Sequence, residues 1–118
     1  MTGSVGYDAG DVAEDIVASD YICRNYQLAA RRWRGKGGEI DLVMRDGDKV
    51  IFVEVKKSKT FAAAARRLKG TQMERICTAA QEFLAGEPRG QLTNVRFDLA
   101  MVDGTGAVKV IENAFMEG

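Results

Sequence analysis

At 118 residues, with 46% hydrophobic and 29% charged residues, the chain has the length and composition of one globular domain. It contains no histidine, which excludes His-based acid–base catalysis and His-ligated zinc, and its 17 basic residues balance 17 acidic ones, which argues against a simple polycationic binder of nucleic acid. No apolar run approaches the roughly 18 residues of a membrane span, and the first residues lack the pattern of a signal peptide, so we expect a cytoplasmic protein with no membrane partner.

The N-terminal part begins with a predicted flexible tail, residues 1–8, ahead of a single domain over residues 9–118. Apolar residues recur at helical spacing from Gly10 to Asn25, which predicts a helix there. Residues 26–34 predict a strand, and the glycine-rich sequence after it predicts a turn.

The two clearest strands are predicted at residues 38–44 and 49–57, where apolar residues predominate. An Asp-Gly pair between them indicates a hairpin turn. Residues 60–70 form a basic, alanine-rich stretch that fits either the start of a helix or a mobile loop.

The C-terminal part contains a predicted helix at residues 71–85, which ends at the sequence GEPRG. Residues 93–102 and 107–115 predict two further strands, separated by a glycine-containing turn. The element order α-β-β-β-α-β-β predicts an α/β domain with a mixed β-sheet flanked by helices.

The predicted hairpin places charged residues along the most apolar segment of the chain. Strand alternation puts Asp41 on one face of the first strand, and it puts Glu54 and Lys56 on one face of the second. A two-residue turn at positions 46–47 sets Asp41 diagonal to Glu54, roughly 7–8 Å away, whereas a turn at positions 47–48 sets the two acids directly opposite. Both registers predict that the three side chains share one face of the sheet.

Two neighbouring carboxylates repel each other unless one is protonated or a cation lies between them. An all-oxygen site of this kind suits Mg²⁺ or Mn²⁺, with the backbone carbonyl of Val55 as a further candidate ligand. Such a metal would hold a phosphate oxygen and lower the pKa of a bound water. Lys56 would orient that water, help to deprotonate it or stabilise the charge on phosphorus. The alternative is that Glu54 and Lys56 form a solvated pair on a half-exposed sheet.

Basic residues are segregated along the chain. Residues 24–36 and 56–75 contain 12 of the 17 basic residues and only one of the 17 acidic residues. Such segregation can give a neutral protein a positive face, or it can mark two separately solvated surfaces. The candidates for phosphate contacts are Arg31, Arg32, Arg34, Lys36, Lys57, Lys59, Arg66 and Arg67.

The segment GGEIDLVMRDGDKVIFVEVKKSK is similar to the signature of the YraN-like bacterial proteins, an uncharacterised family. The segments AGDVAEDIVASDY, RRWRGKGGEIDLV, RICTAAQEFL, VRFDLAMVD and IENAFM extend the resemblance over most of the chain. The fold of that family resembles those of archaeal Holliday junction resolvases and the wider PD-(D/E)xK nuclease superfamily. The resemblance therefore implies a nuclease-like domain with a restriction-endonuclease-like core over residues 9–118.

The resemblance also implies roles for individual residues. Asp41 and Glu54 match the metal-binding acids of the superfamily, and Lys56 matches its catalytic lysine. Glu14 matches an acid of the first helix that can complete the metal site, and Gln72 matches a polar position on the second helix that often contributes to the site.

The sequence departs from the family pattern in three places. Lys57 and the two residues after it replace the usual Thr-Arg, Arg32 replaces a frequent Asn, and Gln72 replaces a frequent Lys. Glu39 belongs to the Gly-Glu-Ile-Asp run of the family, and the resemblance leaves two roles open for it: binding a second ion or tying down the loop. The metal-binding acids and the lysine are intact, which favours a competent site.

These features lead to three hypotheses about function. The first is an Mg²⁺- or Mn²⁺-dependent endonuclease acting on branched or single-stranded DNA in recombination, repair or DNA processing. The second is a binding module that keeps the nuclease fold and binds nucleic acid without cutting it, and the third is a scaffold protein with no nucleic-acid role. The resemblance to resolvases also favours a homodimer, because cutting both strands of a junction requires two sites related by a twofold axis.

Overall fold

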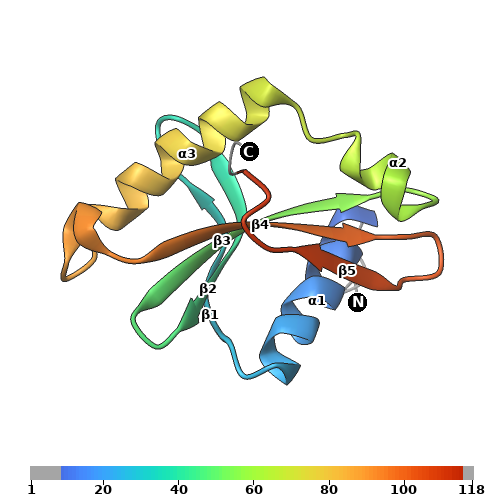
Figure 1. The fold of residues 1–118 in the computed structure, drawn as a ribbon, viewed down its shortest axis with the longest axis horizontal. Coiled ribbons are helices and arrows are strands. Elements are labelled where there is room, and N and C mark those ends of the chain that lie inside the picture. The colour runs from blue at the N-terminus through green and yellow to red at the C-terminus, as the bar shows by residue number, and fades with distance from the viewer. Residues whose placement is uncertain (1–8, 116–118) are drawn as a thin grey trace, which may run out of the picture.

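The computed structural model describes residues 9–115, so the predicted tail at residues 1–8 lies outside the described residues. A five-stranded mixed sheet lies between α1 on one face and α2 and α3 on the other (Figure 1). The helices are α1 (Ala9–Cys23), α2 (Phe61–Ala65) and α3 (Gly70–Leu84), and the strands are β1 (Gln27–Arg34), β2 (Glu39–Asp46), β3 (Lys49–Lys57), β4 (Val95–Val102) and β5 (Val108–Ile111).

The strands lie in the sheet in the order in which they occur in the chain. β1, β2 and β3 are antiparallel neighbours, and the segment containing α2 and α3 then crosses over to make β4 parallel to β3. β5 returns antiparallel to β4. The predicted α/β class, mixed sheet and order of the main elements are confirmed.

The hairpin between β2 and β3 adopts the second of the two registers that the sequence allows. Asp46 pairs with Lys49, and the backbone pairs continue as far as Leu42 and Val53. The turn is therefore at positions 47–48, and Gly47 has a positive φ of 61°. Glycine adopts this conformation without steric strain, which explains why the turn forms there.

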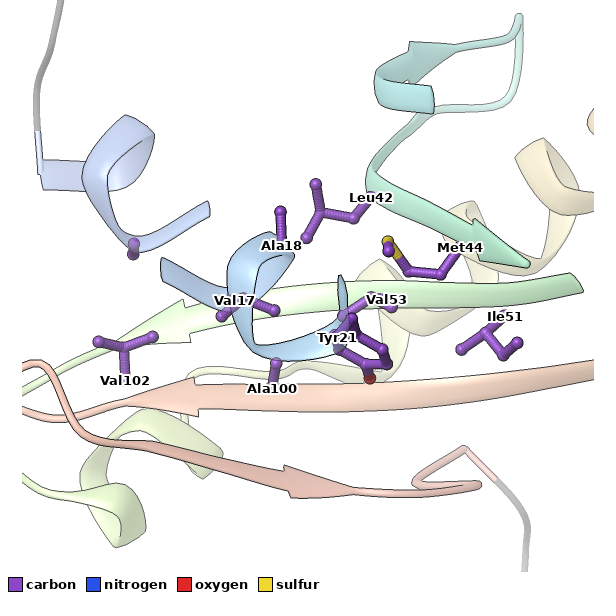
Figure 2. Close-up of a cluster of buried hydrophobic side chains, with 10 residues drawn as sticks. Val17, Ala18, Tyr21, Leu42, Met44, Ile51, Val53, Ala100 and Val102 are labelled. Atoms are coloured by element: carbon purple, nitrogen blue, oxygen red, sulfur yellow. The ribbon is translucent and has the colours of Figure 1, made fainter. Parts of the chain in front are cut away.

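The core on the α1 face depends on alternate residues of the central strands. Val17, Ala18 and Tyr21 of α1 are buried against β2, β3 and β4. Figure 2 shows these side chains over the strands, with the hydroxyl oxygen of Tyr21 directed toward β4. The strand residues of this cluster are Leu42, Met44, Ile51, Val53, Ala100 and Val102.

The core on the α3 face uses the other set of strand positions. Ile76 and Leu84 of α3 pack on β2 and β3, and the ring of Phe52 stacks on Phe97 with 5.2 Å between centroids. Since β3 contributes to both cores, five consecutive residues from Val50 to Glu54 are buried. Burial on both faces explains the continuous apolar run that identified this strand in the sequence.

The structure resolves the ambiguous segment and shifts several predicted element bounds. The ambiguous residues 60–70 contain the short helix α2, whose first turn is capped by Thr60 Oγ1, which accepts from Ala63 N–H at 3.1 Å. β4 begins two residues later than predicted, after a 3₁₀ turn at Gly90–Leu92. β5 ends at Ile111 rather than at residue 115, because the following turn bonds elsewhere: Ala114 N–H donates to Phe97 O at 2.8 Å.

Across residues 9–115, the structure contains no helix with the length and apolarity needed to span a bilayer.

Candidate functional site

A cleft of about 560 Å³ opens where α1, the start of β2, the end of β3 and the start of α3 meet. The predicted metal ligands and catalytic residues all line this cleft, although they come from four different elements. The lining residues are Gly10, Ala13, Glu14, Asp41, Glu54, Val55, Lys56, Lys57, Arg67 and Gln72.

Asp41 is held where the pairing of β2 with β3 ends. The last backbone pair of this ladder joins Leu42 to Val53. Asp41 is the residue before Leu42 on β2, and its Oδ2 accepts a hydrogen bond from Val55 N–H at 2.8 Å. The side chain thus satisfies a backbone donor that the ladder leaves open, and this contact fixes the carboxylate at the edge of the cleft.

The carboxyl groups of Asp41 and Glu54 form a close, mostly buried pair. Extending the observed register by one residue places the two acids opposite each other, and a hydrogen bond joins their side chains. Burial, followed by the charge of Asp41, raises the pKa of Glu54 to about 8. Burial also raises the pKa of Asp41. The pair therefore retains a proton near neutral pH, as expected for two acids that cannot both ionise without a cation.

Two polar side chains hold Glu54 from the cleft side. Lys56 Nζ lies 3.2 Å from Glu54 Oε2, and Gln72 Nε2 donates to the same oxygen at 2.5 Å. Lys56 lies two residues after Glu54 on β3, so the two side chains share one face of the strand, and Gln72 belongs to the first turn of α3. The strand therefore presents the acid and the ammonium to the same space, and the helix orients the acid.

Glu14 lines the same cleft but is bonded to arginines. Its Oε1 accepts from Arg32 Nε at 2.9 Å and lies 3.5 Å from a terminal nitrogen of Arg31. Burial, then the charge of Asp41, raises the pKa of Glu14 to about 7. Within residues 9–115, no group of three or more histidine, cysteine, aspartate or glutamate side chains is placed to hold a metal. All three predicted acids thus line the cleft, but they form no three-ligand metal group within the described residues.

The residues of the pair fit a hard divalent cation. The available donors are carboxylate oxygens from Asp41 and Glu54, with Val55 beside them in the cleft. Mg²⁺ usually keeps several of its waters and binds through one or two carboxylates, so a two-acid site meets its needs. A cation would also offset the charge of Asp41, which helps to raise the pKa of Glu54.

The predicted phosphate-binding residues divide into two groups. Lys57 and Arg67 line the cleft, and an Arg67 guanidinium nitrogen donates to Lys57 O at 2.7 Å. The arginines of β1 are instead paired with acids: Arg31 with Asp15 and Glu14, Arg32 with Asp11 and Glu14, and Arg34 with Glu39. Lys36, Lys59 and Arg66 do not line the cleft.

Glu39 forms an ion pair at the start of β2. Its Oε2 accepts from Arg34 at 3.0 Å, which joins the two ends of the turn between β1 and β2. It lies in a neighbouring cavity that also contains Asp41 and Glu54.

The sequence interpretation missed a buried charged network behind the site. Asp98 is fully buried and accepts from Arg96 through two bonds of 2.8 Å and from Tyr21 O–H at 2.7 Å. The signal was present in β4, where Arg96 and Asp98 interrupt an apolar strand on one face.

The family profile and the similar proteins all point to the same family. The profile of the uncharacterised protein family UPF0102 matches residues 13–102. A UPF0102 protein of Cereibacter sphaeroides is 62% identical over 115 residues, which is 98% of each chain. A UPF0102 protein of Ruegeria pomeroyi is 56% identical, over 98% of this chain and 94% of the relative. One of Dinoroseobacter shibae is 43% identical, over 92% of this chain and 81% of the relative.

The chain therefore belongs to the UPF0102 family, which is the YraN-like family that the sequence resembles.

Proposed function

We propose that this member of the UPF0102 family is a metal-dependent endonuclease that hydrolyses phosphodiester bonds in DNA. The observation that carries the proposal is the close, mostly buried pair of Asp41 and Glu54 beside Lys56 in an open cleft. A structural ion pair needs only one acid for one lysine, whereas here a second buried acid raises the pKa of the first. This arrangement is unfavourable for stability alone and is typical of a functional site.

The residues of the cleft have distinct roles in this proposal. Asp41 and Glu54 would hold one Mg²⁺ or Mn²⁺, with the carbonyl of Val55 as a further ligand. The bound ion would supply a water of lowered pKa and a positive charge for the scissile phosphate. Lys56 Nζ would donate a hydrogen bond to the attacking oxygen, or its positive charge would stabilise the negative charge that builds on phosphorus. Gln72, bonded to Glu54 Oε2, acts as a positioning residue.

The basic wall of the cleft supports a polyanionic substrate. Lys57 and Arg67 lie beside the acids and would contact phosphates, so binding should weaken as the salt concentration rises. The proposed substrate is branched or single-stranded DNA, processed in the cytoplasm during recombination or repair. A homodimer would bring two such clefts to a junction.

One observation favours a second candidate function. Glu14, which would complete a three-acid metal site, is instead bonded to Arg32 and close to Arg31. A site with two acids and an occupied third position is also what a binding module would show if it had kept the nuclease fold without the activity.

A cleavage assay separates the two functions. We expect the wild-type protein to cut labelled junction, flap or single-stranded DNA in Mg²⁺ or Mn²⁺. We expect Lys56→Ala to lower the rate by roughly 100-fold or more, because the ammonium beside the reacting phosphate is lost. DNA binding, measured by fluorescence anisotropy, should weaken by less than about threefold.

Lys49→Ala is the matched control, since Lys49 lies on the same strand beside the hairpin turn and away from the cleft. The catalytic role of Lys56 is wrong if Lys56→Ala and Lys49→Ala cut at the same rate. Binding without cutting in either metal would favour the binding module.

A further inference from the structure

The carboxylates of Asp41 and Glu54 line two cavities rather than one. The first is the cleft described above, with Lys57 and Arg67 in its wall. The second, of about 330 Å³, lies toward the turn between β1 and β2, and it shares Gln72 as well as the two acids with the first. Space for a ligand therefore continues from the acids in two directions.

Arg75 is the basic residue of the second cavity. It lies on α3 three residues after Gln72, and side chains at this spacing share one face of a helix. Arg75 is exposed, and within residues 9–115 its guanidinium forms no ion pair with an acid. The acid of the same cavity, Glu39, is engaged by Arg34 at 3.0 Å. Arg75 therefore keeps its charge and its donors for a ligand.

The turn between β1 and β2, which lines the second cavity beside Arg75, is held in place. The carboxylate of Glu82 on α3 accepts from the backbone N–H groups of Lys36 at 2.8 Å and Gly37 at 2.7 Å. The next residue, Gly38, lies so close to α3 that an added Cβ would come within 3.2 Å of Arg75 Cβ. The turn is thus fixed to the helix, and the cavity has a preset shape.

We propose that the second cavity is a phosphate subsite, in which Arg75 binds the nucleic-acid strand on the side of the scissile bond opposite Lys57 and Arg67. This inference rests on the proposed function, because it takes the acids as the point of cleavage. A strand crossing the acids carries a phosphate on each side of the cut, and basic residues then meet it on both sides. A cavity of this volume is at the low end for small ligands and accommodates one sugar-phosphate, and a guanidinium can bind its oxygens in a bidentate manner.

The first test measures how much Arg75 contributes to the salt dependence of oligonucleotide binding. A fluorescent single-stranded oligonucleotide is titrated in EDTA, so that no cutting occurs, at several salt concentrations. We expect Arg75→Gln to weaken binding roughly threefold to tenfold at low salt and to reduce the slope of log affinity against log salt by about 0.7. Arg89→Gln removes the same charge at an exposed position past the other end of α3, and it should change neither quantity.

The second test locates the phosphate. Single phosphates of the oligonucleotide are replaced one at a time by neutral methylphosphonates. In the wild type we expect the methylphosphonate at one position flanking the scissile bond to weaken binding. In Arg75→Gln we expect the same methylphosphonate to cause no further loss of affinity. The two changes would then be non-additive, as required for groups in direct contact.

The outcomes distinguish the subsite from the proposed nuclease. Equal binding by Arg75→Gln and Arg89→Gln, together with cleavage that requires Lys56, would overturn the subsite and leave the nuclease standing. Arg75-dependent binding without cleavage in Mg²⁺ or Mn²⁺ would support the subsite and overturn the nuclease. If the wild type does not bind the oligonucleotide at low salt, both are wrong.

Discussion

Glu54 is the residue whose environment differs most from that of an exposed carboxylate. Burial and the neighbouring Asp41 raise its pKa to about 8, so the folded protein holds a proton that an unfolded chain loses near the ordinary pKa of 4.5. Between these two pH values the folded state binds more protons than the unfolded state. Stability should therefore fall as pH rises across this window, and it should level off above pH 8.

We predict that the free energy of unfolding of the metal-free protein falls by roughly 2–4 kcal/mol from pH 5 to pH 8. Glu54→Gln cannot ionise and should flatten much of this dependence, whereas the exposed Glu74→Gln should keep it. Urea unfolding in EDTA at a series of pH values measures the effect. Mn²⁺ should raise the melting temperature more at pH 8 than at pH 6, because it binds the ionised pair. A Glu54→Gln profile identical to that of the wild type would show that the pair holds no extra proton.

Arg32, where the sequence departs from the family pattern, has an unusual backbone conformation. It has a φ of +50°, although it lies within β1 and is not glycine. Asparagine adopts this conformation more readily than most residues, which fits the Asn that the family resemblance implies at this position. Here the guanidinium of Arg32 binds Asp11 and Glu14, and these bonds compensate for a backbone cost of about 1 kcal/mol.

The turn between β1 and β2 is the element that couples the sheet to α3. Its glycines lie against the helix at distances that leave no room for side chains. A Cβ built on Gly37 would lie 2.3 Å from Thr78 Cγ2, and one on Gly35 would lie 2.8 Å from the Glu82 carboxylate. Backbone hydrogen bonds from the turn lower the pKa of Glu82, so this acid stays ionised and keeps the contact.

We predict that Gly37→Ala lowers the free energy of unfolding by about 1–3 kcal/mol, because the new methyl group overpacks the contact with Thr78. Gly70→Ala is the matched control: a Cβ there meets nothing within 4 Å, so stability should be unchanged or slightly higher. Urea unfolding measures both variants. Gly37→Ala/Thr78→Ser should recover part of the loss, since the serine lacks the clashing methyl. Equal stability of Gly37→Ala and the wild type would mean that the turn is not held against α3.

Local patterns predicted elements well where one residue type decides the geometry. The Asp-Gly pair predicted the hairpin, and strand alternation brought Asp41, Glu54 and Lys56 to one cleft. The register remained open between two alternatives, because both turn positions include Gly47. The end of β5 was missed because it depends on a hydrogen bond between Ala114 and Phe97, and such distant contacts leave no periodic signal in the sequence.

At the scale of the whole molecule, the network around Asp98 joins α1 to the sheet and to the C-terminal turn. The carboxylate links α1 through Tyr21, β4 through Arg96 and the C-terminal turn through Asn113 N–H at 3.3 Å. Arg96 also donates to the hydroxyl oxygen of Tyr26 at 3.1 Å. In residues 9–115 every buried side-chain nitrogen and oxygen has a hydrogen-bond partner. Removing one charge would leave its partner buried and uncompensated.

We predict that Asp98→Asn destabilises the protein by about 3–5 kcal/mol, because Arg96 then loses its buried counter-charge and keeps only the exposed Glu112, at 3.5 Å. Arg96→Met alone should also be destabilising, since it leaves the Asp98 carboxylate buried. The double variant Arg96→Met/Asp98→Asn should be more stable than the sum of the single changes implies, by at least about 1 kcal/mol, because neither charge remains. Urea unfolding of the four proteins gives this coupling energy directly. Additive losses of stability would mean that the two groups do not depend on each other. The helices and the sheet would then be joined by the apolar clusters on the two faces of the sheet alone.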